Sequence, residues 1–276
     1  SDKWNLNFVL GMKMKLIVAS RKDPAAENIR SHLLELYDFE SSKENPEFHT
    51  YKGVGLISIP GGATQLSAPP IDTEEVIFAS RHVSRTGRPT LTAHVPGEPS
   101  EYELAIASPQ TIKAALRGLI EARDGLGISY DVSLEATHHG PTRLEVPVTF
   151  VEIGSSPQQW RDSKAGEAVA RAIMTAARKP IEGRPAIGFG GTHYARRHTE
   201  VVLRTDVSVG HIFPKYLSLD EKLARAALTR TKGGSILFAL DWKGLRSSSR
   251  ERIKTTATKL GVQAVRERDL LAQAKL

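Results

Sequence analysis

Residues 135–142, Glu-Ala-Thr-His-His-Gly-Pro-Thr, combine a carboxylate, two hydroxyls and two adjacent imidazoles in a short stretch. Neutral imidazoles act as general bases near neutral pH and are the commonest metal ligands in proteins. Just before them, apolar and polar residues alternate from 128 to 136, which predicts a strand with one face in a core. Gly140 and Pro141 end this strand. The sequence therefore places Glu135 and two histidines at the end of a buried strand.

Other histidines also follow predicted strands. Ligands of open α/β sheets bind beyond the carboxyl ends of the strands, so histidines at the ends of mutually parallel strands would share one edge. Five strand ends carry histidine: His82 after strand 75–79, His94 at the end of strand 90–95, His138 and His139 after strand 128–136, His193 after strand 186–189, and His211 after strand 199–210.

Spacing limits the roles of these histidines. On a straight strand, His138 and His139 point to opposite faces, so we expect one to serve the site while the other packs or orients it. His193 and His198 are five residues apart, and both reach a common centre only if residues 195–197 turn. We interpret His32 and His49 as ordinary surface or packing residues.

Metal-assisted hydrolysis is one chemistry open to these residues. Three nitrogen or carboxylate ligands with an open position would activate a water molecule. The candidates are His94, His139, His193 and either Glu135 or Glu200, although no HExxH spacing defines a zinc site. Ser80, Ser84 and Thr192 are possible nucleophiles, but no Gly-x-Ser-x-Gly motif is present. Gly190 and Gly191 let the backbone approach a ligand, or make a turn.

The elements that must position these residues alternate between strands and helices. Asp23 and Pro24 begin a helix as N-cap and first helical residue. This alternation predicts a mostly parallel sheet covered on both faces. We expect a flexible leader or cloning remnant at 1–13 and a single α/β domain over 14–276. Strands are predicted at 14–20, 53–60, 75–79, 90–95, 128–136, 146–153, 186–189, 199–210 and 236–241, and helices at 23–37, 108–125, 162–179, 219–231 and 249–260, with a last turn at 270–274.

The composition of the chain limits the chemistry it can use and the kinds of partner it can bind. The 276-residue chain has no cysteine, which excludes disulfides, thiolate zinc sites and cysteine nucleophiles and fits a cytoplasmic protein. No apolar run is long enough to cross a bilayer. The net charge of +7 favours an anionic partner, nucleic acid first, or else a uniformly basic surface. Basic residues cluster at 81–88, at 196–197 and in the tail 243–275. Tyr194, Phe213 and Tyr216 lie beside basic residues and would stack on bases or be buried rings.

Taken together, several segments resemble the archaeal and plant type of D-aminoacyl-tRNA deacylase. They extend from about residue 14 to 245 in the order found in that family. No single segment is specific for the family, but the combination of segments is. Arg196 departs from the family pattern, which has proline at this position. The shape of the turn before His198 therefore does not follow from the resemblance. The matching segments are Ser-Arg-His at 80–82, Leu-Thr-Ala-His-Val-Pro-Gly at 91–97, Glu-Ala-Thr-His-His-Gly-Pro at 135–141, Gly-Gly-Thr-His-Tyr-Ala at 190–195, His-Thr-Glu at 198–200 and Gly-His-Ile-Phe-Pro-Lys-Tyr at 210–216.

The resemblance implies hydrolysis of the ester that joins a D-amino acid to the 3′ end of tRNA, with broad tolerance of the side chain and an association with zinc. It implies a three-layer α/β/α sandwich around a mostly parallel mixed sheet, similar to phosphorylases and peptidyl-tRNA hydrolases. We expect a monomer that acts on tRNA and not at a membrane. The basic charge, the histidine-bearing strand ends and the absence of cysteine agree with this function.

On this hypothesis, a water activated by a metal or a histidine attacks the aminoacyl carbonyl. The catalytic candidates are His139, His193, Glu135, His94, His138 and Thr192, and the metal candidates are His94, His139 and His193. Gly190, Gly191 and Thr192 would offer donors to the oxyanion. The residues expected to bind tRNA or substrate are Arg81, His82, Gly190, Gly191, Tyr194, Arg196, Arg197, His198, His211 and Lys215.

Three alternatives stay open. In one, the 2′-hydroxyl of the RNA transfers the proton and the protein supplies only position. In the second, the chain is a nucleoside phosphorylase or hydrolase with a phosphate pocket. In the third, it binds RNA without catalysis, and the histidines only contact RNA.

Overall fold

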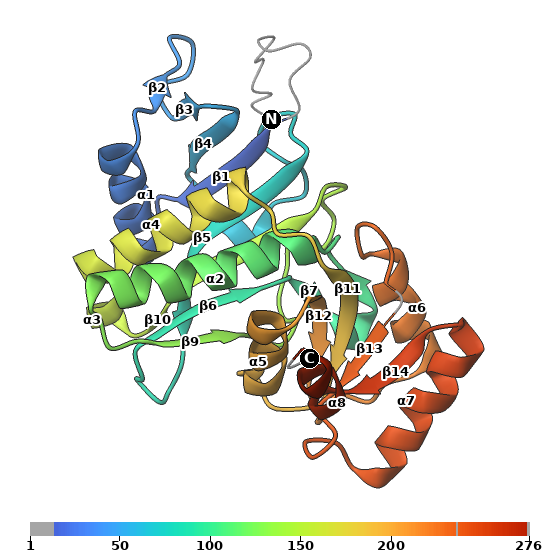
Figure 1. The fold of residues 1–276 in the computed structure, drawn as a ribbon. Helices are drawn as coiled ribbons and strands as arrows, with labels where there is room; N and C mark the ends of the chain where they lie inside the picture. The colour runs from blue at the N-terminus through green and yellow to red at the C-terminus, as the bar shows by residue number, and fades with distance from the viewer. Residues whose placement is uncertain (1–13, 236, 275–276) are drawn as a thin grey trace.

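A computed structural model describes residues 14–235 and 237–274 of the chain (Figure 1). The leader expected at 1–13 lies outside these residues. The main sheet has eight strands, in the spatial order β2 (Glu40–Ser41), β3 (Phe48–Tyr51), β4 (Val54–Ile59), β1 (Lys15–Ser20), β5 (Glu75–Val83), β10 (Val148–Ser155), β6 (Thr90–His94) and β9 (Asp131–Leu134). Four of its seven strand pairs are parallel. The predicted mixed α/β fold with a mostly parallel main sheet is confirmed.

Three helices, α1 (Pro24–Leu36), α2 (Pro109–Leu126) and α4 (Ser163–Arg178), pack on one face of the main sheet (Figure 1). The N-cap prediction for α1 is confirmed, because Asp23 accepts hydrogen bonds from the N–H groups of Ala25 and Ala26. Lys15 on β1 donates to Thr111 of α2 and to a carbonyl of α4, and pairs with Glu75 at 3.0 Å. This buried ion pair fixes which face of the sheet the helices cover.

A second sheet of four parallel strands was not anticipated from the sequence. Its order is β12 (Val207–Phe213), β11 (Arg184–Phe189), β13 (Leu237–Leu240) and β14 (Gln263–Arg266). Side chains alternate along β13, so Phe238 and Leu240 join a small core under α6 (Glu221–Thr229) and α7 (Ser247–Leu260), while Leu237 and Ala239 join the main core. The second sheet is therefore buried on both faces.

The strand predicted at 199–210 is wrong over its first half, which forms the helix α5 (Arg196–Arg204). Val201 and Val202 are buried, while Glu200 pairs with Arg197 and Arg204 at three- and four-residue spacing on the exposed side. This spacing is that of a helix surface. The remaining short elements are α3 (Pro157–Trp160), α8 (Glu267–Gln273), the hairpin β7 (Gly97–Glu98) and β8 (Glu103–Leu104), and single 3-10 turns at Ala63–Gln65 and Pro99–Glu101.

Strand direction also differs from the expectation of one shared edge. β6 runs antiparallel to β10, and β9 runs parallel to β6, so their carboxyl ends point away from those of β5 and β10. His94 and His82 therefore do not end neighbouring parallel strands. Within the described residues, no helix combines the length and the apolar character needed to span a bilayer.

Candidate active site

Polar side chains gather on the face of the main sheet opposite the helices. Successive side chains of a strand point to opposite faces. Because Glu75 meets Lys15 on the helix-covered face, His82 of the same strand lies on the other face. The register of the sheet places Glu152 of β10 and His94 of β6 on that face as well. A site thus forms across the sheet surface, where the histidines of oppositely directed strands can still meet.

Glu135 is central to this site. Its side chain is fully buried, and Oε1 lies 3.1 Å from Nδ1 of His82. Oε2 lies 3.1 Å from Nε2 of His193, 3.6 Å from Nε2 of His138 and 4.0 Å from Nδ1 of His94. One carboxylate therefore contacts four imidazoles from distant parts of the chain. We call the complete set the histidine–glutamate cluster; its members are His82, His94, Glu135, His138, His139, Glu152 and His193.

The backbone of residues 135–139 joins the two sheets. The N–H of Ala136 donates to the carbonyl of His193, and the N–H of Thr137 donates to the carbonyl of Ile212 on β12. An isolated antiparallel bridge also links Glu135 with Tyr194. These bonds fix the end of β9 against the loop after β11, and so bring His193 to Glu135.

His138 and His139 point to the same site, contrary to the expectation for a straight strand. His139 has a φ of +44°, in the left-handed region that non-glycine residues rarely adopt. This turn brings the two rings to a centroid distance of 4.4 Å. The ring of His94 lies 4.3 Å from that of His138 and 4.9 Å from that of His139. Backbone strain of this kind is concentrated at functional sites.

Hydrogen bonds define the tautomers of both residues. Nδ1 of His138 lies 2.8 Å from the carbonyl oxygen of Ala136, and Nδ1 of His139 lies 2.6 Å from that of Gly140. Because a carbonyl oxygen only accepts, each Nδ1 carries the proton and each Nε2 keeps a free lone pair. Metal-binding and basic histidines commonly have this arrangement.

The ionisation states within the cluster diverge. Burial opposes the charged form of His82, but its contacts with Glu135 and Glu152 raise its pKa to about 11. Burial also opposes ionisation of Glu135, yet the hydrogen bonds from His193 and His82 hold its pKa well below the usual range. Glu152 is fully buried, which raises its pKa to about 7. The cluster thus contains a buried imidazolium beside a buried carboxylate.

Three of the other imidazoles, those of His94, His138 and His139, are neutral at physiological pH. Burial lowers the pKa of His138 to about 4 and also lowers that of His139. Burial, followed by the neighbouring imidazoles of His138 and His139, holds the pKa of His94 well below its usual value. Neutral imidazoles are the form that takes up a proton or binds a metal ion.

The cluster fits a metal ion. Both ring nitrogens of His94 and Oε2 of Glu152 are buried without a hydrogen-bond partner, which is costly unless a further group satisfies them. Among the described residues, donor atoms come within 4.8 Å of one another in three groups: His82, Glu135, His138 and His193; His94, His138 and His139; and His94, Glu135 and Glu152. The metal ligands expected from the sequence, His94, His139 and His193, thus fall in overlapping groups, in which His138 belongs to both the first and the second.

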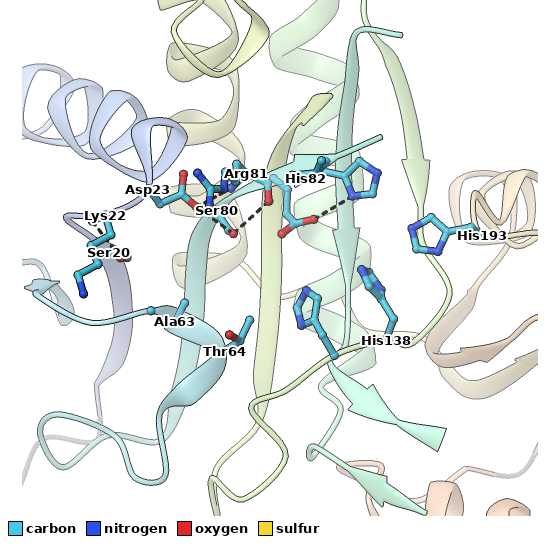
Figure 2. Close-up of a pocket in the computed structure, with 14 residues that line it drawn as sticks. Ser20, Lys22, Asp23, Ala63, Thr64, Ser80, Arg81, His82, His138 and His193 are labelled. Atoms are coloured by element: carbon cyan, nitrogen blue, oxygen red, sulfur yellow. Dashed lines mark hydrogen bonds and ion pairs between the residues drawn. The ribbon is translucent and has the colours of Figure 1, made fainter. Parts of the chain in front are cut away.

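A cavity of about 390 Å³ opens onto the cluster. This volume is within the range of small-molecule sites. Figure 2 shows the imidazoles of His82, His138 and His193 at one end of it, with Lys22 and Asp23 toward the other. The loop after β4, including Gly62 and Thr64, forms another part of the wall. The residues that line the cavity are Ser20, Lys22, Asp23, Gly62, Ala63, Thr64, Ser80, Arg81, His82, Val83, His138, His139, Glu152 and His193.

Glu152 was missed by the sequence analysis. It is the single charged residue within the otherwise apolar strand β10, and it lies 3.6 Å from Nδ1 of His82 and 3.8 Å from Nδ1 of His94. A charged residue in a continuous apolar strand was the available signal, because charged groups are seldom fully buried unless paired. Lys22 and Asp23 were also missed as cavity residues.

Several expected substrate residues adjoin the cluster. The hydroxyl of Tyr194 lies 3.0 Å from Nε2 of His82. Arg81 lines the cavity, and its guanidinium lies over the ring of Trp160. Thr192 is exposed, and its hydroxyl donates to the carbonyl of Tyr194. Tyr194 therefore contacts the histidine–glutamate cluster, and Arg81 lines the cavity.

Two expected substrate residues, His198 and His211, are buried and do not line the cavity. His198 is fully buried on α5, with Nδ1 at 2.7 Å from Oε1 of Glu267. His211 is fully buried on β12, where Nε2 donates to the carbonyl of Ala105 and Nδ1 lies 3.2 Å from Oγ1 of Thr137. Both histidines bind protein atoms and support the fold around the site.

The remaining expected residues lie outside the cavity. The N–H of Gly190 donates to the carbonyl of Phe213, so it is not a free oxyanion donor. Gly191 accepts from the N–H of Lys215 and has a φ of +80°, which favours glycine. Arg196, Arg197 and Lys215 are exposed, and Arg197 pairs with Glu200 at 2.8 Å.

The chain is similar in sequence to known proteins and similar in fold to a solved structure. The profile of the family described as D-aminoacyl-tRNA deacylase matches residues 70–265. The D-aminoacyl-tRNA deacylase of Methanosarcina mazei is 35% identical over 278 residues, covering 92% of each chain. That of Pyrococcus furiosus is 34% identical over 273 residues, covering 92% of this chain and all of the relative. A crystal structure described as a conserved protein of unknown function superimposes with a TM-score of 0.85 at 32% identity, covering 94% of this chain and 97% of the other.

Proposed function

The chain belongs to the D-aminoacyl-tRNA deacylase family, and from this premise we propose that the histidine–glutamate cluster is where it hydrolyses the ester between a D-amino acid and the 3′ end of tRNA. The chain is thus an ester hydrolase whose substrate is a D-aminoacyl-tRNA. The observation that carries the assignment of the site is the cavity beside the buried Glu135–His193 pair. Its volume suits the terminal aminoacylated nucleoside and not a folded RNA.

His193 is the proposed general base. Its Nε2–H donates to Oε2 of Glu135, so Nδ1 is left with a free lone pair. The carboxylate orients the ring and stabilises the imidazolium that forms when Nδ1 takes a proton, as in other carboxylate–histidine pairs. His193 also keeps 34% of its side-chain surface exposed, which gives it access to a water in the cavity.

The proposed hydrolysis then proceeds in two steps. Nδ1 of His193 takes a proton from water while the water oxygen bonds to the ester carbonyl carbon. The bond from that carbon to the ribose 3′-oxygen breaks, and His193 returns the proton to this oxygen. The products are a free D-amino acid and a tRNA with an intact 3′ end.

His94, His138 and His139 are the proposed zinc ligands. Their neutral imidazoles, the free Nε2 atoms of His138 and His139 and the two unpartnered nitrogens of His94 favour this set over the carboxylate-containing groups. A zinc ion bound there would polarise the ester carbonyl and stabilise negative charge on its oxygen. Glu135 and His193 are then left to position the water and move the proton.

Lys22 and Arg81 are the proposed contacts for the tRNA end. Both line the cavity on the side away from His193, and neither forms an ion pair among the described residues. A phosphate of the terminal nucleotides would supply the missing anion. Asp23 is saturated by the N-cap bonds of α1 and by the N–H of Arg81, so it holds this wall in place.

Deacylation of matched D- and L-aminoacyl-tRNAs by the wild type and by His193→Ala tests the assignment. Loss of the general base should lower kcat by about 10²- to 10⁴-fold for the D-ester. His32→Ala is the matched control, because His32 lies on α1 and, among the described residues, its ring nitrogens pair with Ser163 and Glu35 and with no member of the cluster. Equal hydrolysis of both esters by the wild type would contradict the function, and full activity of His193→Ala would contradict the role of His193.

A substrate that ends in 2′-deoxyadenosine separates protein-based from RNA-assisted proton transfer. With His193 as the base, the single-turnover rate is expected to be unchanged within a fewfold. A loss comparable to that of His193→Ala would instead assign proton transfer to the 2′-hydroxyl.

A further inference from the structure

The basic charge of the chain is concentrated at its C-terminal end. Residues 241–276 contain nine lysine and arginine residues against four aspartate and glutamate residues, a net charge of +5 out of +7 for the whole chain. This segment forms α7, β14 and α8 beside the second sheet (Figure 1). The proposed reaction uses none of these residues.

Three of these basic side chains lie over the ring of Trp242. The guanidinium of Arg266 lies 4.1 Å from the centroid of the Trp242 ring, that of Arg250 lies at 4.7 Å, and the ammonium of Lys254 lies at 5.5 Å. These side chains come from α7 and from the end of β14. The negative face of the indole attracts each cation and offsets part of their mutual repulsion. We call this group the Trp242 cation cluster.

Little negative charge balances this cluster. Among the described residues, neither Arg250 nor Arg266 has a carboxylate oxygen within 4.0 Å, and only Lys254 is paired, with Glu251 at 3.2 Å. Nε of Arg250 is buried without a hydrogen-bond partner. An unsatisfied buried guanidinium nitrogen is unfavourable unless an acceptor reaches it. The cluster is therefore complementary to an anion with several oxygen atoms.

The Trp242 cation cluster adjoins the active site through the backbone. The N–H of Asp241 donates to the carbonyl of Phe189 at the end of β11. Gly190 and Gly191 pack so closely against Asp241 and Gly244 that a Cβ on Gly190 would meet the backbone of Asp241. Two residues later, the same loop supplies His193 to the cavity. The segment that carries His193 therefore packs against the residues on either side of Trp242.

We propose that the Trp242 cation cluster binds the phosphodiester backbone of the tRNA at the nucleotides that precede its aminoacylated end. The proposal rests on the proposed function, because the ester must reach the cavity at the 3′-terminal nucleotide. Arg250 and Arg266 contact phosphate oxygens, and Trp242 holds their guanidinium groups in place. Such contacts recognise the RNA backbone without reading its sequence.

Binding of deacylated tRNA over a series of salt concentrations tests this surface without requiring turnover. The double substitution Arg250→Gln/Arg266→Gln should weaken binding by at least about tenfold at low salt. It should also reduce the slope of log affinity against log salt by about two, one for each arginine that no longer neutralises a phosphate. Lys52→Gln/Arg178→Gln is the matched control, since these two cations share the ring of Tyr51 near the edge of the main sheet. It should leave both affinity and slope at wild-type values.

Turnover of two substrates completes the test. With D-aminoacyl-tRNA, Arg250→Gln/Arg266→Gln should lower kcat/KM by the same factor as the affinity for tRNA, whereas with the D-aminoacyl ester of adenosine it should match the wild type within twofold. Arg250→Lys/Arg266→Lys keeps the charges and should keep the salt slope. Unchanged tRNA binding by the glutamine variant, or an equal loss with both substrates, would overturn the proposal.

The single variants Arg250→Gln and Arg266→Gln test whether a loss of binding comes from misfolding. In each of them the slope of log affinity against log salt should fall by about one. A single variant that melts at the wild-type temperature and keeps the full slope overturns the proposal as well. The wild type could hydrolyse neither D-aminoacyl-tRNA nor the D-aminoacyl ester of adenosine and still bind tRNA with this dependence on salt. That result would contradict the proposed function and support the proposed tRNA-binding surface.

Discussion

Oε2 of Glu135 lies 3.1 Å from Nε2 of His193, although the two residues are 58 positions apart in the chain. Glu135 follows β9 of the main sheet, and His193 follows β11 of the second sheet. The bridge between Glu135 and Tyr194 and the bond from Ala136 to His193 hold the two segments side by side. The proposed active site therefore lies where the two sheets meet.

Glu135→Gln is expected to lower kcat/KM for D-aminoacyl-tRNA by about 100-fold or more, because His193 loses the carboxylate that stabilises its protonated form. The substitution also leaves the buried charge of His82 with a single carboxylate, Glu152. Removing one partner of a buried pair costs about 3 kcal/mol in the free energy of unfolding. Deacylation kinetics and urea unfolding measure the two effects.

Glu145→Gln is the matched control for this change. Glu145 is 79% exposed and pairs with Arg230 at 3.4 Å, so its loss should change the unfolding free energy by less than about 1 kcal/mol. Wild-type activity of Glu135→Gln would remove Glu135 from the mechanism.

Metal binding should depend most on His138, which belongs to both groups of donors that contain three or more imidazoles. His138→Ala is expected to weaken zinc binding by at least about tenfold if the ion lies in either of these two groups. If the ligands are those proposed, His139→Ala should weaken binding and His193→Ala should not. Zinc content after dialysis, together with competition against a chelator, measures both affinity and stoichiometry. A His138→Ala protein that binds zinc like the wild type would exclude both of these groups and leave, among the described residues, the group of His94, Glu135 and Glu152.

Arg81→Gln is expected to raise KM for D-aminoacyl-tRNA about tenfold with little change in kcat, because it removes one charge-assisted bond to the tRNA end. The backbone N–H of residue 81 can still donate to Asp23, so the wall of the cavity should persist. Arg161→Gln serves as the control, since Arg161 is exposed and, in the part of the chain that the structure describes, donates only to the carbonyl of Pro157. A fall in kcat with unchanged KM would place Arg81 in the chemical step.

Acid should destabilise the protein partly through His211. Burial lowers the pKa of His211 in the folded protein to about 4, whereas the unfolded chain takes up this proton near pH 6.5. The unfolded state therefore gains stability as the pH falls from 6.5 to 4, and the folded state does not. The expected loss from this group approaches about 3 kcal/mol at pH 4 and is absent above pH 6.5.

His211→Gln removes this titration and keeps a donor for the carbonyl of Ala105. The difference in unfolding free energy between the wild type and the variant should shrink as the pH falls from 6.5 to 4. Parallel stability curves over this range would show that His211 does not titrate in this way.

Much of the secondary structure was predictable because its signals are local. Asp23 and Pro24 begin α1 as expected, and the alternating residues before Glu135 form β9. One exception is α5, which forms the first half of the segment predicted as a strand at 199–210. Its helix depends on packing Val201 and Val202 against the core and on ion pairs between neighbouring turns, which short-range propensity does not weigh.

The sequence by itself determined the supply of chemistry: the neighbouring Glu135, His138 and His139, the histidine-bearing loops and the absence of cysteine. The tertiary structure alone decided which of these groups meet. It placed Glu152 beside His82, brought His193 to Glu135, and buried His198 and His211 against Glu267 and Ala105. The physical reason is that capping and periodicity act over a few residues, whereas these distances follow from the order and direction in which remote strands pair.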